Sequence, residues 1–237
     1  MRYIAKGDVP ACLQDWVDAQ LATEEPVNVT YAAFPSGKQL LGELTDEQFG
    51  LCGYTGAPVY EGRVSGLRNS TASPASFRNH IEHLKCQAVC KQELRSAGHT
   101  YGSVLGDDLN YHNMIAALEV RGSEGEQFGA VIKKDKILPI LPTVSDCHDH
   151  FSYREDGGVD GRTEEGSEAI SLLRLDHPTL CGWRVSAIDE WLDDDILQSR
   201  EDIFEVIRAL RMAIDGQLPE FSFVIEAVAS GYLDVSG

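Results

Sequence analysis

The sequence predicts an α+β fold in which a small, irregular centre is enclosed by helices from both ends of the chain. Of the 237 residues, 43% are hydrophobic and 8% are aromatic, which is enough apolar material for a globular core. Apolar residues recur at three- and four-residue steps near both ends of the chain, as they do on amphipathic helices. The middle instead carries short apolar or alternating segments between turn residues, which is typical of strands and loops.

The first predicted element is a helix over residues 8–22, DVPACLQDWVDAQLA. It opens with a proline, which favours the first turn of a helix, and its spacing places Cys12, Trp16 and Ala19 on one side. A second helix is predicted over residues 36–50, SGKQLLGELTDEQFG, and it ends at the final glycine. The N-terminal part of the chain is therefore expected to be helical.

The central segments are shorter. Residues 51–64 (LCGYTGAPVYEGRV) are rich in turn residues and then extended, and residues 78–84 (RNHIEHL) alternate as a short strand. A long loop is predicted over residues 96–113, where positioned functional groups are common. Two short apolar elements follow, MIAALEV at 114–120 and GAVIKK at 129–134, and the pattern leaves their type open.

The last part of the chain is predicted to be mostly helical after a turn at residues 153–162, YREDGGVDGR. Its apolar spacing indicates four helices, over residues 167–175, 185–199, 200–215 and 219–233. The chain thus divides into an N-terminal helical part (1–50), a core (51–140) and an acidic helical part (141–237). We expect these parts to form a single compact unit.

The formal net charge is −18, which taken alone disfavours binding to nucleic acid. The charge is unevenly distributed, however. Between residues 62 and 95 six basic residues stand against two acids, and a second basic group follows about forty residues later (Arg63, Arg68, Arg78, Lys85, Lys91 and Arg95; then Lys133, Lys134 and Lys136). Such runs are either solvated surface or a binding zone, and the acidic residues gather mainly between 142 and 202.

No apolar run approaches the roughly 20 residues needed to span a bilayer, so no membrane partner is expected. The first sixteen residues lack the apolar region and cleavage site of an export signal. The six cysteines, at positions 12, 52, 86, 90, 147 and 181, are scattered and are interpreted as reduced thiols. A cytoplasmic protein is therefore expected.

Residues 77–86, FRNHIEHLKC, gather groups that bind metals and transfer protons. Three interpretations remain open. The histidines are hydrogen-bonded members of a polar core, or His80, His83, Cys86 and Cys90 bind zinc, although zinc ligands usually come from two separate segments. In the third interpretation His83 is a general base that deprotonates water, while Glu82 holds a divalent cation on the scissile phosphate.

A catalytic histidine needs a group that orients it, and Asn113 enters an apolar segment about thirty residues later. The pair of segments HIEHLK and YHNMI resembles the His–Asn core of the HNH nucleases, which have a ββα-metal fold. The wider order of MRYIAKGDVP, GLCGYTG, ILPILPTVSDCHDHFSYREDGGV and EAISLLRLDHPTLCGWRVSAI resembles the HNH proteins of retrons and of the Septu anti-phage system, the PtuB-like family. The likeness covers roughly residues 1–190.

The resemblance implies a small HNH core embedded in helices, and a metal-dependent endonuclease that hydrolyses nucleic-acid phosphodiesters. By position, His83 is the expected general base and Glu82 the expected metal ligand. Asn113 is expected to fix the geometry of the histidine, and His80 to support catalysis from the start of the strand. The third metal ligand stays open among His99, His112, Glu124 and Glu126.

The resemblance also implies partners. Mg²⁺ or Mn²⁺ is the expected cofactor, nucleic acid (DNA ahead of RNA) the expected substrate, and an ATPase subunit of an anti-phage defence system the expected controller. Arg78, Lys85, Lys133 and Lys134 are expected to contact the nucleic acid. Association into a homo-oligomer is left open.

The sequence departs from the family at its thiols. Thr55 stands where the second cysteine of a C-x-x-C is usual, and FGAVIKK at 128–134 lacks the usual Cys-Gly pair. Zinc is therefore not expected, and packing around Phe128 and Val131 is expected to replace it. The alternative function is a catalytically weakened HNH-like scaffold or regulatory subunit that acts through protein–protein contacts.

Overall fold

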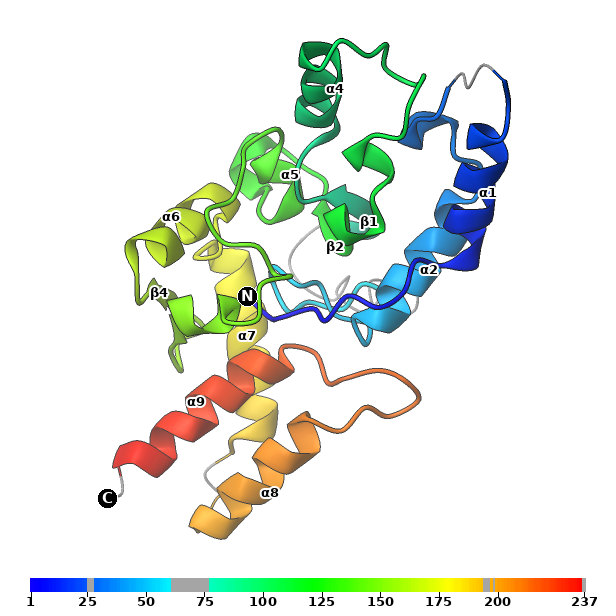
Figure 1. Cartoon of the computed structure of the whole chain (residues 1–237). Helices are drawn as coiled ribbons and strands as arrows, with labels where there is room; N and C mark the ends of the chain where they lie inside the picture. The colour runs from blue at the N-terminus through cyan, green and yellow to red at the C-terminus, as the bar shows by residue number, and fades with distance from the viewer. Residues whose placement is uncertain (25–27, 61–76, 194–196, 198, 236–237) are drawn as a thin grey trace.

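The computed structural model describes residues 1–24, 28–60, 77–193, 197 and 199–235. Its architecture confirms the predicted α+β class, with two small antiparallel sheets among helices (Figure 1). The helices are α1 (Ala11–Leu21), α2 (Gly37–Glu47), α4 (Gln87–Ser96), α5 (Ala130–Lys133), α6 (Glu164–Leu173), α7 (Pro178–Trp191), α8 (Arg200–Leu210) and α9 (Ser222–Val235). The strands are β1 (Phe77–His83), β2 (Met114–Val120), β3 (Phe151–Tyr153) and β4 (Val159–Gly161).

The antiparallel pair β1–β2 lies at the centre of the core. Phe77 is opposite Val120 at one end of the pair, and His83 is opposite Met114 at the other. Strand β2 is buried along its length except at Glu119, as its almost continuous apolar sequence requires. Helix α2 packs against β2, and the chain leaving α2 is fixed there because the buried Gln48 amide bonds both the N–H and the carbonyl of Ala116, at 2.7 and 2.8 Å.

The two N-terminal helices occur where they were predicted, but the buried side of α1 differs from the prediction. Leu13 and Val17 are buried, whereas Ala19 is exposed. Cys12 and Trp16 are half-buried. The Trp16 ring packs against the ring of Phe34 at a centroid distance of 5.4 Å. The helix is therefore rotated by about one residue from the predicted orientation, toward its two larger aliphatic side chains.

Two elements differ from the sequence prediction, and a third settles a segment whose type the sequence left open. Helix α4 (Gln87–Ser96) follows β1 directly and was not predicted, since its only buried residue is Cys90 and its apolar stripe is weak. The segment expected as a simple turn at 153–162 is the end of a hairpin in which β3 and β4 pair from Phe151↔Gly161 to Tyr153↔Val159. Residues 129–134, whose type the sequence did not decide, contain the short helix α5.

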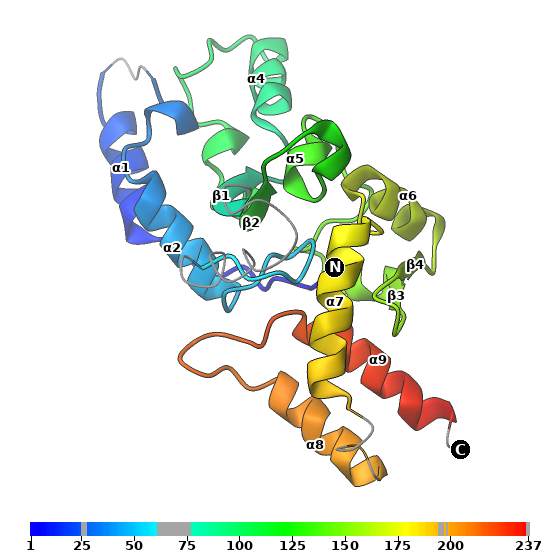
Figure 2. The same cartoon turned by 180° about the vertical axis from the view of Figure 1, so that it is seen from behind.

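The C-terminal helices were predicted, but several boundaries differ; α8, for example, ends at Leu210, five residues before its predicted end. Helix α7 begins at Pro178, seven residues before the predicted start, where proline is favoured and the His177 side chain accepts a bond from Thr179 N–H. Figure 2 shows α7 running from the body of the molecule toward α8 and α9, which pack against each other. No helix in the segments drawn as ribbons is long and apolar enough to cross a membrane.

Candidate functional site

The end of strand β1 brings together the residues that the sequence singled out. The antiparallel register places Met114 opposite His83, so Asn113 comes next to the chain that leaves β1. The backbone N–H of Leu84 donates to the Asn113 carbonyl at 2.9 Å, which closes this end of the pair. Because neighbours on a strand point to opposite faces, His83 and Glu82 lie in two different environments.

His83 lies in the more enclosed environment and is only 5% exposed. Its Nε2 is 2.9 Å from the backbone carbonyl of Asp108, and a carbonyl only accepts, so Nε2 carries the hydrogen. The lone pair is therefore on Nδ1, which is 3.4 Å from the Gln87 side-chain amide. Burial lowers the pKa of His83 below its ordinary value, so the ring is neutral near pH 7 and Nδ1 is its basic atom.

The Tyr31 ring packs nearly at a right angle against the imidazole, at a centroid distance of 4.6 Å. Tyr31 is also tied to the loop that holds His83, because its backbone N–H donates to the Asp108 carboxylate at 3.0 Å. Tyr101 donates to the same carboxylate oxygen at 2.7 Å. Asp108 thus orients the histidine through its carbonyl and fastens its own loop through its side chain.

Asn113 fixes the two ends of the long connection between β1 and β2. Its side-chain oxygen accepts from Lys85 N–H at 2.7 Å, and its NH₂ donates to the carbonyls of Lys85 and Asp107, both at 2.9 Å. None of these hydrogen bonds involves the ring of His83. Its effect on the histidine passes through Asp107, which immediately precedes the residue that holds Nε2.

On the opposite face of β1, Glu82 is paired within the chain. Lys133 Nζ lies 2.8 Å from Glu82 Oε1, and His80 Nε2 lies 3.5 Å from Glu82 Oε2. Lys133 also donates to the carbonyl of His83 at 3.0 Å. The Lys133–Glu82 contact is an ion pair without hydrogen-bond geometry, because Glu82 Oε1, like the Tyr54 hydroxyl and His80 Nδ1, is buried with no hydrogen-bond partner among the residues that the structure describes.

The basic residues expected to contact nucleic acid do not form one patch. Arg78 pairs with Glu119 across the strands, and Lys85 pairs with Glu93, at 2.6 Å, and with Asp107. Lys133 is fully buried, so its ammonium does not reach the surface. Lys134, the next residue, is exposed and extends from the end of α5.

The residues present do not fit a divalent metal or a zinc ion. Within the described parts of the chain, no three His, Cys, Asp or Glu side chains gather as a metal centre requires, and this includes the proposed third ligands. The Cys86 thiol donates to the Asp135 carbonyl, and burial raises the pKa of Cys90 to about 11. A divalent ion on Glu82 would meet the Lys133 ammonium.

Aromatic packing surrounds Phe128, in the segment where the HNH resemblance led us to expect thiols. Phe128 is fully buried, with ring centroids 5.6 Å from Trp183 and 5.1 Å from His177. Val131 is half-buried beside it in sequence, and Thr55 is buried with its hydroxyl accepting from Ala57 N–H at 3.2 Å. The packing expected around Phe128 is therefore present.

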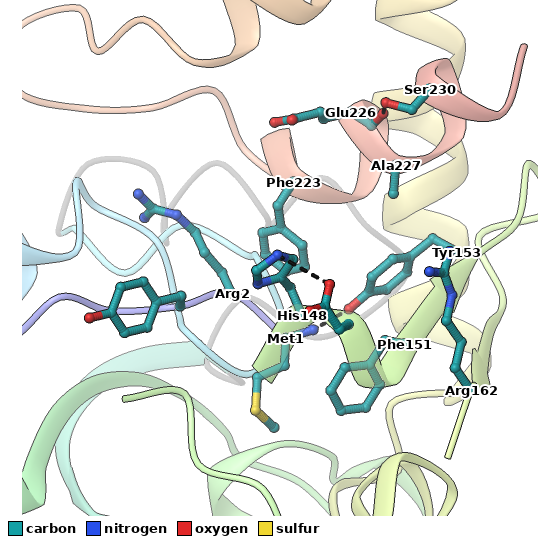
Figure 3. Close-up of a pocket in the computed structure, with 12 residues that line it drawn as sticks. Met1, Arg2, His148, Phe151, Tyr153, Arg162, Phe223, Glu226, Ala227 and Ser230 are labelled. Carbon is teal, nitrogen blue, oxygen red and sulfur yellow. Dashed lines mark hydrogen bonds and ion pairs between the residues drawn. The ribbon is translucent and has the colours of Figure 1, made fainter. Parts of the chain in front are cut away.

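A separate cavity of about 370 Å³ lies between the first residues of the chain, the β3 segment and α9 (Figure 3). Phe151, Tyr153 and Phe223 form part of its wall, and the Arg162 side chain lines one side. The α-amino group of Met1 contacts the Tyr153 hydroxyl, and burial lowers the pKa of this amine to about 4. None of the site residues predicted from the sequence lines this cavity.

The sequence did not reveal the partners that complete the site. Asp108, Gln87 and Tyr31 hold the imidazole, and each comes from a segment that had no distinguishing pattern. A buried lysine beside a glutamate fifty residues away also leaves no local signal, because Lys133 belongs to a run of lysines that is indistinguishable from a solvated group.

No protein-family model matches the sequence, and a search of curated proteins gives no match.

Proposed function

We propose that β1, β2 and α5 form an HNH-type core and that the chain hydrolyses nucleic-acid phosphodiesters with His83 as the general base. The order of the elements supports this, because a strand ending in histidine is followed, after helix α4, by an asparagine-pinned loop, a second strand and a short helix. The resemblance extends the proposal to anti-phage defence, under the control of an ATPase partner and in the cytoplasm.

One observation carries the proposal. The hydrogen bond from His83 Nε2 to the Asp108 carbonyl leaves the lone pair on Nδ1, and burial keeps the ring neutral at physiological pH. Nδ1 then accepts a proton from water while the water oxygen bonds to phosphorus, and the P–O bond to the leaving nucleotide oxygen breaks. The long 3.4 Å contact from Gln87 is the bond that water replaces.

Access to Nδ1 requires a rearrangement around the histidine, since the ring is almost fully buried and Nδ1 faces Gln87 at the start of α4. The loop at 96–113 holds the other ring nitrogen through Asp108 and is fastened at Asn113 and Asp108, while its first residues, 96–100, are exposed. Contact with a controlling partner at this loop would expose the base. Such control suits a nuclease of low sequence preference, which is toxic when it is always active.

A regulatory or scaffold subunit is the second candidate, and the Glu82–Lys133 pair favours it. Both the carboxylate expected to bind metal and the basic residue expected to contact nucleic acid are consumed in a contact within the chain. Arg78 and Lys85 are likewise paired with acids. In this alternative the core positions the chain for protein–protein contact and performs no chemistry.

Cleavage assays with His83→Ala separate the two candidates. Wild type, His83→Ala and the matched control His148→Ala, whose side chain is exposed, are incubated with labelled DNA and RNA in Mg²⁺, in Mn²⁺ and in a chelator. For a hydrolase, His83→Ala loses at least about a hundredfold in rate, the size of a general-base contribution, while His148→Ala retains the wild-type rate. Equal rates for His83→Ala and wild type would contradict the hydrolase. Circular dichroism confirms that each variant is folded.

A further inference from the structure

The carboxylate at the end of β1 already has a cation of its own. Lys133 has no exposed surface, and its Nζ lies 2.8 Å from Glu82 Oε1 and donates to the His83 carbonyl at 3.0 Å. Glu82 itself is nearly enclosed, with 14% of its side chain exposed. An enclosed carboxylate requires a compensating charge, and the chain supplies it from α5.

The position of the Lys133 ammonium is set by the way α5 is anchored to neighbouring elements. Gly129, at the start of α5, has a φ of +71°, forms a bridge with Glu119 on β2, and donates from its N–H to the carbonyl of Leu173 at 2.7 Å. These two anchors hold α5 between β2 and the end of α6. The last residue of α5 is Lys133, so its side chain is directed to the end of β1.

The two oxygen atoms beside this ammonium are of the kind that a divalent cation uses. A carboxylate oxygen and a backbone carbonyl oxygen are hard ligands that Mg²⁺ and Mn²⁺ favour. The His80 ring lies 3.5 Å from the second oxygen of Glu82 and is a third group on the same face of β1 that could coordinate a metal ion. Lys133 Nζ therefore lies among groups that would attract a metal ion if the ammonium were absent.

We propose that the Lys133 ammonium is the permanent cation of this cluster and takes the place that the HNH resemblance assigns to a divalent metal. Glu82 is then not a metal ligand in the wild-type chain, and the pairing of β1, β2 and α5 is complete without a metal. The inference does not depend on the proposed function, because it describes the cation bound at Glu82 whether the chain cleaves nucleic acid or serves as a scaffold.

Titration with Mn²⁺, followed by calorimetry and by electron paramagnetic resonance of free Mn²⁺, tests the proposal without any activity measurement. Lys133→Met removes the ammonium and keeps most of the side-chain volume, and Lys134→Met is the control, since Lys134 is exposed on the same helix end. We expect Lys133→Met to bind one Mn²⁺ at least about tenfold more tightly, or 1.4 kcal/mol, than wild type and Lys134→Met. The additional Glu82→Gln substitution should abolish the gained site.

Two results would overturn the proposal. One is a Mn²⁺ site in the wild-type chain that Glu82→Gln abolishes, because a metal would then displace the lysine. The other is a folded Lys133→Met protein that binds Mn²⁺ no better than wild type. If Lys133→Met does not fold, the comparison of wild type with Glu82→Gln decides alone, with Lys133→Arg as a charge-preserving variant. Neither readout involves cleavage, so failure here is distinct from failure of the hydrolase assay.

Discussion

Nε2 of His83 and the backbone carbonyl of Asp108, twenty-five residues apart in the chain, are joined by a hydrogen bond of 2.9 Å. The bond determines which ring nitrogen carries the hydrogen and therefore which one is basic. It also ties the end of β1 to the loop that precedes β2, so the protonation state of one ring is coupled to the position of that loop.

The first prediction concerns pH. Burial lowers the pKa of His83 in the folded chain, whereas in the unfolded chain it titrates near about 6.5. As the pH falls from about 7.5 to about 5, the unfolded state takes up this proton before the folded state does, so the stabilisation present above the unfolded pKa is lost. Urea unfolding across this range should show a smaller loss for His83→Gln than for wild type.

His112→Gln is the control for this experiment, because its ring is exposed and lies outside the pocket that holds His83. It should reproduce the wild-type pH dependence. If the unfolding free energy of His83→Gln depends on pH as steeply as that of wild type, the pKa of the buried imidazole does not change on folding. That result would contradict a neutral His83 base.

The second prediction concerns the pair of Glu82 and Lys133. Removing either partner leaves a buried charge without compensation, so Glu82→Gln and Lys133→Met should each reduce the free energy of unfolding by about 3 kcal/mol. The double variant buries neither charge and should lose clearly less than the sum of the two. Denaturant unfolding of all four proteins measures the coupling, and additive losses would argue against a direct ion pair.

The third prediction concerns Asn113. Its side chain makes three hydrogen bonds to backbone groups of Lys85 and Asp107, so Asn113→Ala should cost about 3 kcal/mol of unfolding free energy, at roughly 1 kcal/mol for each bond. Hydrogen exchange at the Lys85 amide should accelerate in the variant. Asn110→Ala is the control, because Asn110 is exposed and its side chain accepts one hydrogen bond, from His112 N–H. A loss no larger than that of the control would mean that Asn113 does not pin the loop.

The fourth prediction compares two glycines with similar backbone angles. Gly157, in the turn between β3 and β4, has a φ of +73°, and an added Cβ would overlap the carbonyl of Cys181 at the start of α7. Gly216 has a φ of +77° and open space around it. Gly216→Ala should cost only the left-handed strain of about 1 kcal/mol, and Gly157→Ala about 2 kcal/mol more, through the overlap. Thermal unfolding measures the difference, and equal losses would show that hairpin and helix do not meet as closely as described.

The fold was most predictable where its elements depend on local pattern. Helices α1, α2, α8 and α9 and strand β1 follow from the spacing of apolar residues, because each buries one side of a regular structure. Helix α4 buries only Cys90, so its spacing carried little information. The hairpin β3–β4 is only three residues long on each side, too short for alternation to distinguish it from a turn.

The candidate site was predicted in part. His83 and Glu82 were named from the residue types of one strand and Asn113 from the HNH resemblance, and the structure places all three at one end of the β1–β2 pair. Their roles in the fold were not predictable, because the contacts that define them come from elsewhere. Asp108 sets the tautomer of His83, and Lys133 neutralises Glu82, across separations of 25 and about fifty residues.

The sequence by itself determined the α+β class, most of the helices and the short strand that carries two histidines and a glutamate. Only the tertiary structure decided what those side chains face: a carbonyl and a tyrosine ring for His83, and a buried ammonium for Glu82. The physical reason is that regular structure arises from neighbours within a few residues, whereas the environment of a buried charge is set by whichever distant segments the fold packs around it.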